Sequence, residues 1–210
     1  TFRWSPDPAT EWIRHTLSCM PIRPLPRVLV DQIAAGEVVE RPAGAVKELV
    51  ENAVDAGATQ IEVHIADGGR SLISVRDNGL GIAPDELGLA VSPHATSMIA
   101  TVHDLDAILT MGFRGEALAS IGAVSRLTVR SQCKSAQEGG EIRVEGGRMG
   151  DVRPWSGAQG TIVEAEDLFH NLPARAAFLK SPRAEAMRVG ETLMAMALAH
   201  PTVGLRFVVD

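Results

Sequence analysis

The sequence has little cysteine and no long apolar run. Cys19 and Cys133 are its two cysteines, and they lie far apart and outside any Cys-x-x-Cys pair, so a disulfide framework and a zinc-ligand pattern are both excluded. No apolar stretch approaches the roughly 18–20 residues that cross a bilayer. Residues 1–20 carry charges where a signal peptide is apolar. We therefore expect a cytoplasmic protein in a reducing compartment, without membrane attachment.

Signatures of several common enzyme classes are also missing. The sequence has no Gly-x-x-x-x-Gly-Lys-Ser/Thr loop, no Gly-x-Gly-x-x-Gly after an expected strand and no Gly-x-Ser-x-Gly elbow, so P-loop, Rossmann and serine-hydrolase sites are unsupported. The histidines are scattered, with no two at metal-binding spacing. The net charge of −6 argues against strong nucleic-acid binding by this chain alone. The basic residues between 175 and 188 favour a solvated helix face over a basic strip.

The composition is that of a globular protein. With 210 residues, 45% of them apolar and 22% charged, the chain fits one large domain or one domain with appendages. Residues 1–19 hold two of the three tryptophans and show no sustained period. We expect them to be a poorly ordered extension before a natural start at Met20. Residues 20–210 are expected to form the folded domain.

Apolar periodicity predicts alternating helices and strands. Helices are expected at 28–39, 42–56, 84–90, 116–122, 173–179 and 185–198, and strands at 60–65, 71–76, 125–131, 141–145, 161–166 and 205–209. A hairpin turn is expected at 67–70. Residues 92–104 have no clean period and are expected to form a mobile loop of the kind that closes over a site. The tally predicts an α+β fold, a two-layer sandwich in which the helices at 42–56, 116–122 and 185–198 cover one face of a mixed, mostly antiparallel sheet.

One amphipathic stretch, Lys47–Gly57, stands at the centre of the sequence. Its apolar residues recur at three- and four-residue steps, as on the buried face of a helix, which Pro42 would open and Gly57 would end. Glu48 and Asn52 are four residues apart and share the polar face. A carboxylate one turn from an amide oxygen can be a base beside a magnesium ligand, because Mg²⁺ prefers oxygen donors. An ordinary solvated helix face is the alternative, and this spacing alone favours it.

Glycine-bearing turns stand at the ends of expected strands and helices. Asp77 ends a strand and is followed by Gly79 and Gly81, which let the backbone approach a flat ligand closely. The Asp77 carboxylate can accept from an exocyclic amine and so favours adenine over guanine; a plain β-turn is equally compatible. Residues 112–115 lead into a helix whose first N–H groups can hold phosphates, although a simple helix-entry loop is the alternative. Gly160-Thr161 opens a strand beside this pocket, or is merely a strand start.

Together these motifs resemble the four ATP-site motifs of the GHKL ATPase superfamily, which contains gyrase-type ATPases, Hsp90, histidine kinases and MutL. They occur in the same order and spacing, as Glu48-x-x-x-Asn52, Asp77-x-Gly79-x-Gly81, Gly112-Phe-Arg-Gly115 and Gly160-Thr161. Within this superfamily, residues 32–42, 47–58, 94–97, 112–121 and 171–175 resemble the MutL family of DNA mismatch-repair proteins. The resemblance covers about residues 20–210 and implies the GHKL (Bergerat) type of sandwich. One such motif is weak evidence, whereas five in register are specific.

The resemblance implies a role for each matching residue. Glu48 matches the general base that activates water for attack on the γ-phosphate of ATP, and Asn52 matches the ligand of a Mg²⁺ ion that bridges the phosphates. Asp77 matches the adenine-reading carboxylate, which Thr161 supports through a bound water. The other ATP-binding positions that the resemblance implies are Gly79, Gly81, Thr96, Ser97, Gly112, Phe113, Arg114, Gly115, Glu116, Ala117 and Leu118.

The resemblance also implies what the protein does. It implies the ATP-hydrolysing N-terminal domain of a MutL-type protein, a homodimer on ATP binding, whose partners are a MutS-type mismatch sensor, DNA and a downstream endonuclease or helicase. Pro93 and Met98 depart from the family pattern around the lid, which puts charged lid contacts in doubt. The chain is expected to end before a second domain that inserts a lysine towards the γ-phosphate. Two alternatives follow: an ATP-binding interaction module with negligible hydrolysis, and another GHKL ATPase such as a gyrase-like enzyme.

Overall fold

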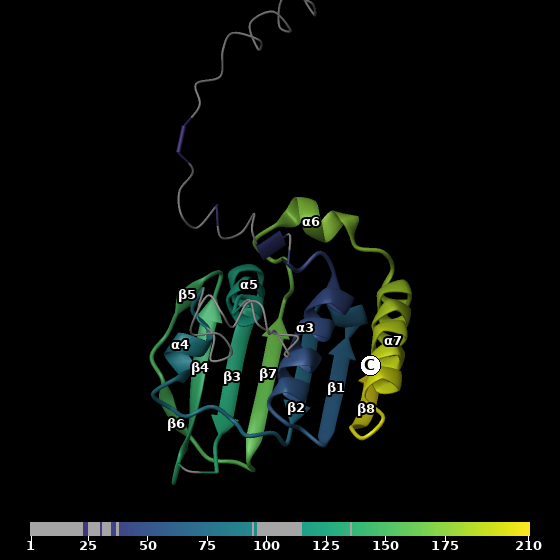
Figure 1. Ribbon diagram of the computed structural model, residues 1–210. Helices are drawn as coiled ribbons and strands as arrows, with labels where there is room; N and C mark the ends of the chain where they lie inside the picture. The colour runs from purple at the N-terminus through teal and green to yellow at the C-terminus, as the bar shows by residue number, and fades with distance from the viewer. Residues whose placement is uncertain are drawn as a thin grey trace, which may run out of the picture.

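The protein is an α+β sandwich in which helices cover one side of a single sheet (Figure 1). The computed structural model describes residues 23–24, 30, 35–36, 38–93, 95, 115–134 and 136–210. This arrangement confirms the two-layer fold that the sequence predicts. The expected extension at 1–19, most of the helix at 28–39 and most of the loop at 92–104 lie outside the described residues.

Eight strands of the described chain form one mixed sheet. They are β1 (Gln60–Ala66), β2 (Leu72–Asp77), β3 (Arg126–Gln132), β4 (Gly139–Glu145), β5 (Arg148–Met149), β6 (Arg153–Trp155), β7 (Gly160–Glu166) and β8 (Gly204–Val209). Their order is β5-β4-β3-β7-β2-β1-β8, with β6 pairing on β4. All pairs are antiparallel except β1 with β8. The sheet is therefore mixed and mostly antiparallel, as predicted.

The labelled helices of the described chain differ in how they meet the sheet. They are α3 (Pro42–Asp55), α4 (Leu87–Ala90), α5 (Ala117–Val124), α6 (Pro173–Phe178) and α7 (Pro182–Ala199), and all except α6 bury residues. Pro42 opens α3, where a first-turn proline costs no hydrogen bond. Gly57 follows the end of α3 with a φ of +72°, a conformation that glycine adopts without steric cost. The boundaries of α3 thus agree with the sequence pattern to within one residue.

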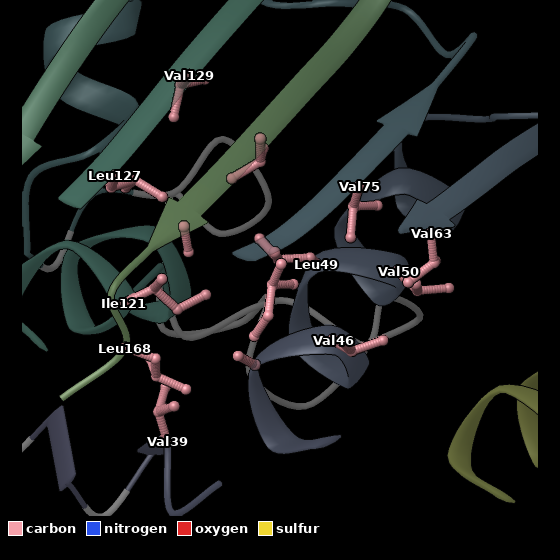
Figure 2. Packing of buried hydrophobic residues seen from close by; sticks show 14 of the residues in the cluster. Val39, Val46, Leu49, Val50, Val63, Val75, Ile121, Leu127, Val129 and Leu168 are labelled. Atoms are coloured by element: carbon pink, nitrogen blue, oxygen red, sulfur yellow. The ribbon is translucent and has the colours of Figure 1, made fainter. Parts of the chain in front are cut away.

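The core lies between the sheet and α3, α5 and α7. Alternate residues of β1, namely Ile61, Val63 and Ile65, are at most 2% exposed, as expected for a strand with one covered face. Figure 2 shows Val50 of α3 beside Val63 of β1, and Leu49 of the same helix pointing towards the central strands. The three helices expected to cover the sheet do so. No helix in the described part of the chain is long and apolar enough to span a membrane.

The structure differs from the sequence prediction in three short segments. Residues 67–69 form a 3₁₀ turn, η1 (Asp67–Gly69), in place of a tight hairpin turn, yet β1 and β2 pair antiparallel as expected. The glycine-rich stretch 146–160 contains β5 and β6, which are too short to show alternation. The expected helix at 84–90 has only one regular turn, α4, because its first residues form a turn instead.

Candidate functional site

The candidate site is built where α3 ends against the turn after β2. The N–H of Leu80 in this turn donates to the carbonyl of Ala56 at the end of α3 (2.9 Å). A Cβ on Gly79 would lie 2.8 Å from the same carbonyl oxygen, so only glycine allows this close approach. The turn and the helix are therefore in direct backbone contact, and residues of one are fixed relative to residues of the other.

Asp77 occupies the head of this turn as the last residue of β2. Its Oδ1 accepts a hydrogen bond from the N–H of Gly79 (2.8 Å), and the backbone of Thr161 also hydrogen-bonds to the carboxylate. Burial raises the pKa of Asp77, and these two hydrogen bonds only partly offset the rise. Such a carboxylate is costly to bury, which is typical of functional sites.

Two buried hydroxyl groups support the start of β7 beside Asp77. Ser131 of β3 and Thr161 of β7 lie 2.9 Å apart through their hydroxyl oxygens, and Ser131 Oγ also donates to the carbonyl of Gly160. Ser131 Oγ accepts from the N–H of Ile82, just beyond the Asp77 turn (2.7 Å). Every hydrogen bond here crosses between strands or to the turn, so β3, β7 and the turn form one rigid wall.

Among Gly79, Gly81 and Gly160, Gly160 has the closest approach to neighbouring backbone, and its neighbour is Asp77. Its φ is +122°, and a Cβ on it would lie 2.0 Å from the carbonyl oxygen of Asp77. We expect Gly160→Ala to lower the free energy of unfolding by at least about 2 kcal/mol, because it adds a clash to a strained backbone.

Gly57→Ala is the matched control for this prediction. Its φ of +72° is also unfavourable for alanine, but no atom lies within 4 Å of its Cβ position, so it should cost only about 1 kcal/mol. Denaturant unfolding followed by circular dichroism measures both variants. Equal losses would contradict the close packing of Gly160.

Asn78 fixes the turn from its other side. Its Oδ1 accepts from the N–H groups of Thr59 and Gln60 (2.9 Å each), and its Nδ2 donates to Thr59 Oγ1 (2.9 Å). Gln159 adds a fourth side-chain bond, from its Nε2 to the carbonyl of Gly79 (3.1 Å). The sequence interpretation assigned no role to Asn78, Gln159 or Ser131. The sequence offered one signal for Asn78, a polar side chain in an expected turn, and one for Ser131, a polar side chain at an inward strand position.

Two glutamates on α3 have different surroundings. Lys47 Nζ lies 2.6 Å from Glu51 Oε1 and 4.0 Å from Glu48 Oε1. Glu51 is only 7% exposed, so this ion pair, one helical turn apart, accounts for its burial. Glu48 keeps 31% of its side chain exposed, as a base that must reach a water molecule requires. The structure thus distinguishes a buried Glu51 from an accessible Glu48.

Asn52 follows Glu48 by one helical turn and is half-buried. Its amide oxygen is a hard donor of the kind that Mg²⁺ accepts, and Mg²⁺ keeps several waters and binds few protein groups when phosphates are present. Among the described residues, no three His, Cys, Asp or Glu side chains gather as a metal site. The donor set around Asn52 therefore fits a magnesium ion held mainly by a phosphorylated ligand, and not a metal enclosed by protein.

The N-terminus of α5 is the candidate phosphate end of the site. Gly115 precedes it with a φ of +62°, and no side chain caps the helix at Glu116. The first N–H groups of such a helix attract anions. Gly115, Glu116, Ala117 and Leu118 are all partly exposed. The other expected contacts, Thr96, Ser97, Gly112, Phe113 and Arg114, lie outside the described residues.

The structure therefore brings part of the expected site together. The turn with Asp77, Gly79 and Gly81 lies against both α3 and the start of β7, where Thr161 is found. A Cβ on Gly81 would lie 2.3 Å from the carbonyl oxygen of Gln132. The close packing of the turn against β3 therefore also requires glycine at this position. The assignment of each residue to a nucleotide contact stays a prediction.

Comparison with known proteins identifies the family. The family profile described as "Histidine kinase-, DNA gyrase B-, and HSP90-like ATPase" matches residues 40–145. The DNA mismatch repair protein MutL of Xanthomonas campestris pv. campestris (strain B100) is 56% identical over 187 residues, which are 89% of this chain and 30% of that protein. MutL of Xylella fastidiosa (strain M23) is 54% identical over the same shares of both chains. The chain thus spans about a third of the length of these curated relatives.

Solved structures agree with this assignment. The Aquifex aeolicus MutL ATPase domain complexed with ADP is 37% identical with a TM-score of 0.66, over 82% of this chain and 61% of that one. The N-terminal domain of a DNA repair protein is 30% identical with a TM-score of 0.71, over 86% and 52% of the two chains. The resemblance predicted from the motifs is confirmed. The chain belongs to the histidine kinase-, DNA gyrase B- and HSP90-like ATPase family, and within it to the MutL group of DNA mismatch-repair proteins.

Proposed function

We propose that this chain binds and hydrolyses ATP as the N-terminal ATPase domain of a MutL-type mismatch-repair protein. One observation carries the proposal: the turn that holds the half-buried Asp77 carboxylate is hydrogen-bonded to the end of α3, the helix that bears Glu48 and Asn52. The groups proposed to read adenine, to hold magnesium and to act as base thus lie on two elements that a backbone hydrogen bond connects. The Aquifex relative, whose structure is complexed with ADP, supports nucleotide binding by this fold.

The residues divide the chemistry as follows. Asp77 accepts a hydrogen bond from the exocyclic amine of adenine, and the N–H groups at the start of α5 hold the phosphates. Asn52 would hold a magnesium ion through its amide oxygen, and the bound ion would offset phosphate charge. Glu48 takes the proton of the water that attacks the γ-phosphate. The water oxygen bonds to the γ-phosphorus as the bond from that phosphorus to the β–γ bridging oxygen breaks, and ADP leaves.

The wider role of the full-length protein is part of the same proposal. We infer an ATP-driven homodimer that couples a MutS-type mismatch sensor to a downstream endonuclease or helicase on DNA, in the bacterial cytoplasm. The motif that contains Thr96 and Ser97 is proposed to take part in this ATP-driven switch. The division of the chain into an extension at 1–19 and a domain at 20–210 belongs to this proposal. The MutL relatives support it through their identity of more than half over 187 residues.

Titration of the purified domain with ATP, with and without magnesium, tests the function. Magnesium-dependent binding followed by single-turnover release of phosphate is the expected result. Binding without any phosphate release would favour the alternative of a nucleotide-sensing module. Restoration of mismatch repair by the full-length gene in a repair-deficient strain separates a MutL-type protein from a gyrase-like ATPase.

Asn52→Ala is expected to remove the magnesium dependence of ATP binding and to weaken that binding, because the ion loses its ligand from α3. The control is Asn52→Asp, which keeps an oxygen at the same place and should retain a magnesium requirement. Calorimetry with and without a chelator measures both variants. Magnesium-dependent binding that is unchanged in Asn52→Ala would remove Asn52 from the metal site.

A further inference from the structure

The segment 169–175 has no part in the proposed nucleotide chemistry, yet it contacts the end of α5 and the residues that lead into α3. It follows β7 and enters α6, which lies beyond the N-terminal end of α3 (Figure 1). The Asp77 turn is bonded to the opposite, C-terminal end of α3. The segment is therefore remote from adenine recognition and close to the point where the chain enters α3.

Its first contact is with the C-terminus of α5. The last four carbonyl groups of a helix have no partner within the helix. In α5 each of them is satisfied: Ile121 by Ser125 Oγ, Gly122 by the N–H of Gly147, Ala123 by Asn171 Nδ2 and Val124 by the N–H of Phe169. Two of the four donors come from residues 169–171, so this segment fixes the end of α5.

Its second contact is with the helical residues that precede α3. Ala35, Gly36 and Val38 are helical, and the guanidinium of Arg175 donates to the carbonyls of Gly36 and Val39. A cation that bonds the last carbonyls of a helix also opposes its dipole favourably. Val39 stands only two residues before Arg41, the N-cap of α3.

Packing joins these two contacts. The guanidinium carbon of Arg175 lies 5.9 Å from the centre of the fully buried Phe169 ring, within cation–π range. Figure 2 shows Leu168, the residue before Phe169, beside Val39 and close to Ile121 of α5. One short segment thus holds the end of α5 and the entry to α3 in the same place.

We propose that Arg175 is a positioning residue which, together with Asn171, sets the position of Glu48 on α3 relative to the phosphate-holding start of α5. This inference rests on the proposed ATPase function. Arg175 touches neither nucleotide nor magnesium; it acts through the backbone that leads into α3. Both hydrogen bonds come from Nη1, while the guanidinium lies over the Phe169 ring. An arginine is required because a planar guanidinium stacks on an aromatic ring while it donates, which the compact ammonium of a lysine does not reproduce.

Gly36 offers a way to release the same contact from the other side. A Cβ on Gly36 would lie 2.7 Å from the guanidinium carbon of Arg175. Because the neighbour is the end of a flexible side chain, Gly36→Ala should displace Arg175 without breaking the backbone. Arg175→Ala and Gly36→Ala should therefore have the same effect, and the double variant should add little to either.

The test uses the full-length protein and measures kcat, ADP affinity and amide hydrogen exchange well below the melting temperature. For Arg175→Ala, Arg175→Lys and Gly36→Ala, we expect kcat to fall about 10- to 100-fold, because a small misplacement of a catalytic group is costly. ADP affinity should stay within about twofold, since the Asp77 turn is remote. Amides in the first turn of α3 should exchange faster. Arg183→Ala, which removes an exposed arginine of α7, should change none of the three quantities.

The outcomes separate a positioning role from a structural one. A lower melting temperature with unchanged kcat and unchanged exchange in α3 would overturn the proposal. Full activity of Arg175→Lys, or additive losses in the double variant, would also overturn it. If the unaltered protein neither binds ADP nor hydrolyses ATP, the proposed function fails on its own. The positioning role of Arg175 is then tested by the exchange of the α3 amides: unchanged exchange in Arg175→Ala would overturn it.

Discussion

Glu48→Ala is expected to reduce ATP turnover by about 10²- to 10⁴-fold, which is the usual contribution of a general base. ATP binding should be retained, because the proposed adenine and phosphate contacts come from the Asp77 turn and from α5. The structure supports this split: Glu48 is accessible on the middle of α3, and Asp77 lies beyond the end of that helix. Single-turnover phosphate release and ATP calorimetry on the full-length protein measure the two quantities.

Glu51→Ala is the control, because it removes a glutamate from the same helix. Glu51 is buried and paired with Lys47, so its loss should lower the free energy of unfolding, whereas phosphate release by the folded fraction should change much less than in Glu48→Ala. Loss of ATP binding in Glu48→Ala would mean that Glu48 is not the base. Unchanged turnover in that variant would have the same consequence.

The long elements of the fold were predictable because their periods are unambiguous. In β1 the apolar residues Ile61, Val63 and Ile65 alternate, and the structure buries all three. The strands β5 and β6 were missed because two or three residues cannot display a period. Their formation depends on β4, which supplies the partner edge for both. Pairing between separate segments is information that a local pattern does not contain.

The candidate site shows the same division. Glu48 and Asn52 share a helix face and Asp77 ends a strand, so local reasoning could name all three. Ser131 could not be found in this way, because its partner Thr161 is 30 residues further along the chain. Asn78 was overlooked because its contacts, with residues 59 and 60, depend on how the turn folds back against the start of β1.

The glycines of the site have a double meaning that the sequence alone did not reveal. Gly79 and Gly81 were expected to make room for a ligand, and Gly160 to open a strand beside the pocket. The structure shows that each also faces a backbone carbonyl of the protein, those of Ala56, Gln132 and Asp77 respectively. These contacts join α3, β2, β3 and β7 around the turn. The same residues can therefore be required for assembly of the pocket and for binding in it.

Asp77→Asn is expected to weaken ADP and ATP binding by about 10- to 100-fold. A hydrogen bond to a charged group contributes about 1.5–3 kcal/mol, and the amide that replaces the carboxylate presents a donor where adenine also donates. Discrimination against guanine nucleotides should decrease as well. The control is Asn78→Asp, which adds a carboxylate next to Asp77 but keeps the oxygen that accepts from Thr59 and Gln60. Unchanged ADP affinity of Asp77→Asn by calorimetry would exclude Asp77 as the adenine reader.

The pH dependence gives this assignment its sharpest test. Burial raises the pKa of Asp77 above its ordinary value of 3.8. Because the folded pKa is the higher one, the stability that protonated Asp77 contributes is fully present below pH 3.8 and is lost as the pH rises through the folded pKa. ADP binding needs the ionised carboxylate and should respond in the opposite direction, weakening as the pH falls through that pKa. Acidification should thus raise the contribution of Asp77 to the free energy of unfolding of the nucleotide-free domain, while it weakens ADP binding. Both trends should disappear in Asp77→Asn, and an ADP affinity whose pH profile matches in the two proteins would contradict the role of Asp77.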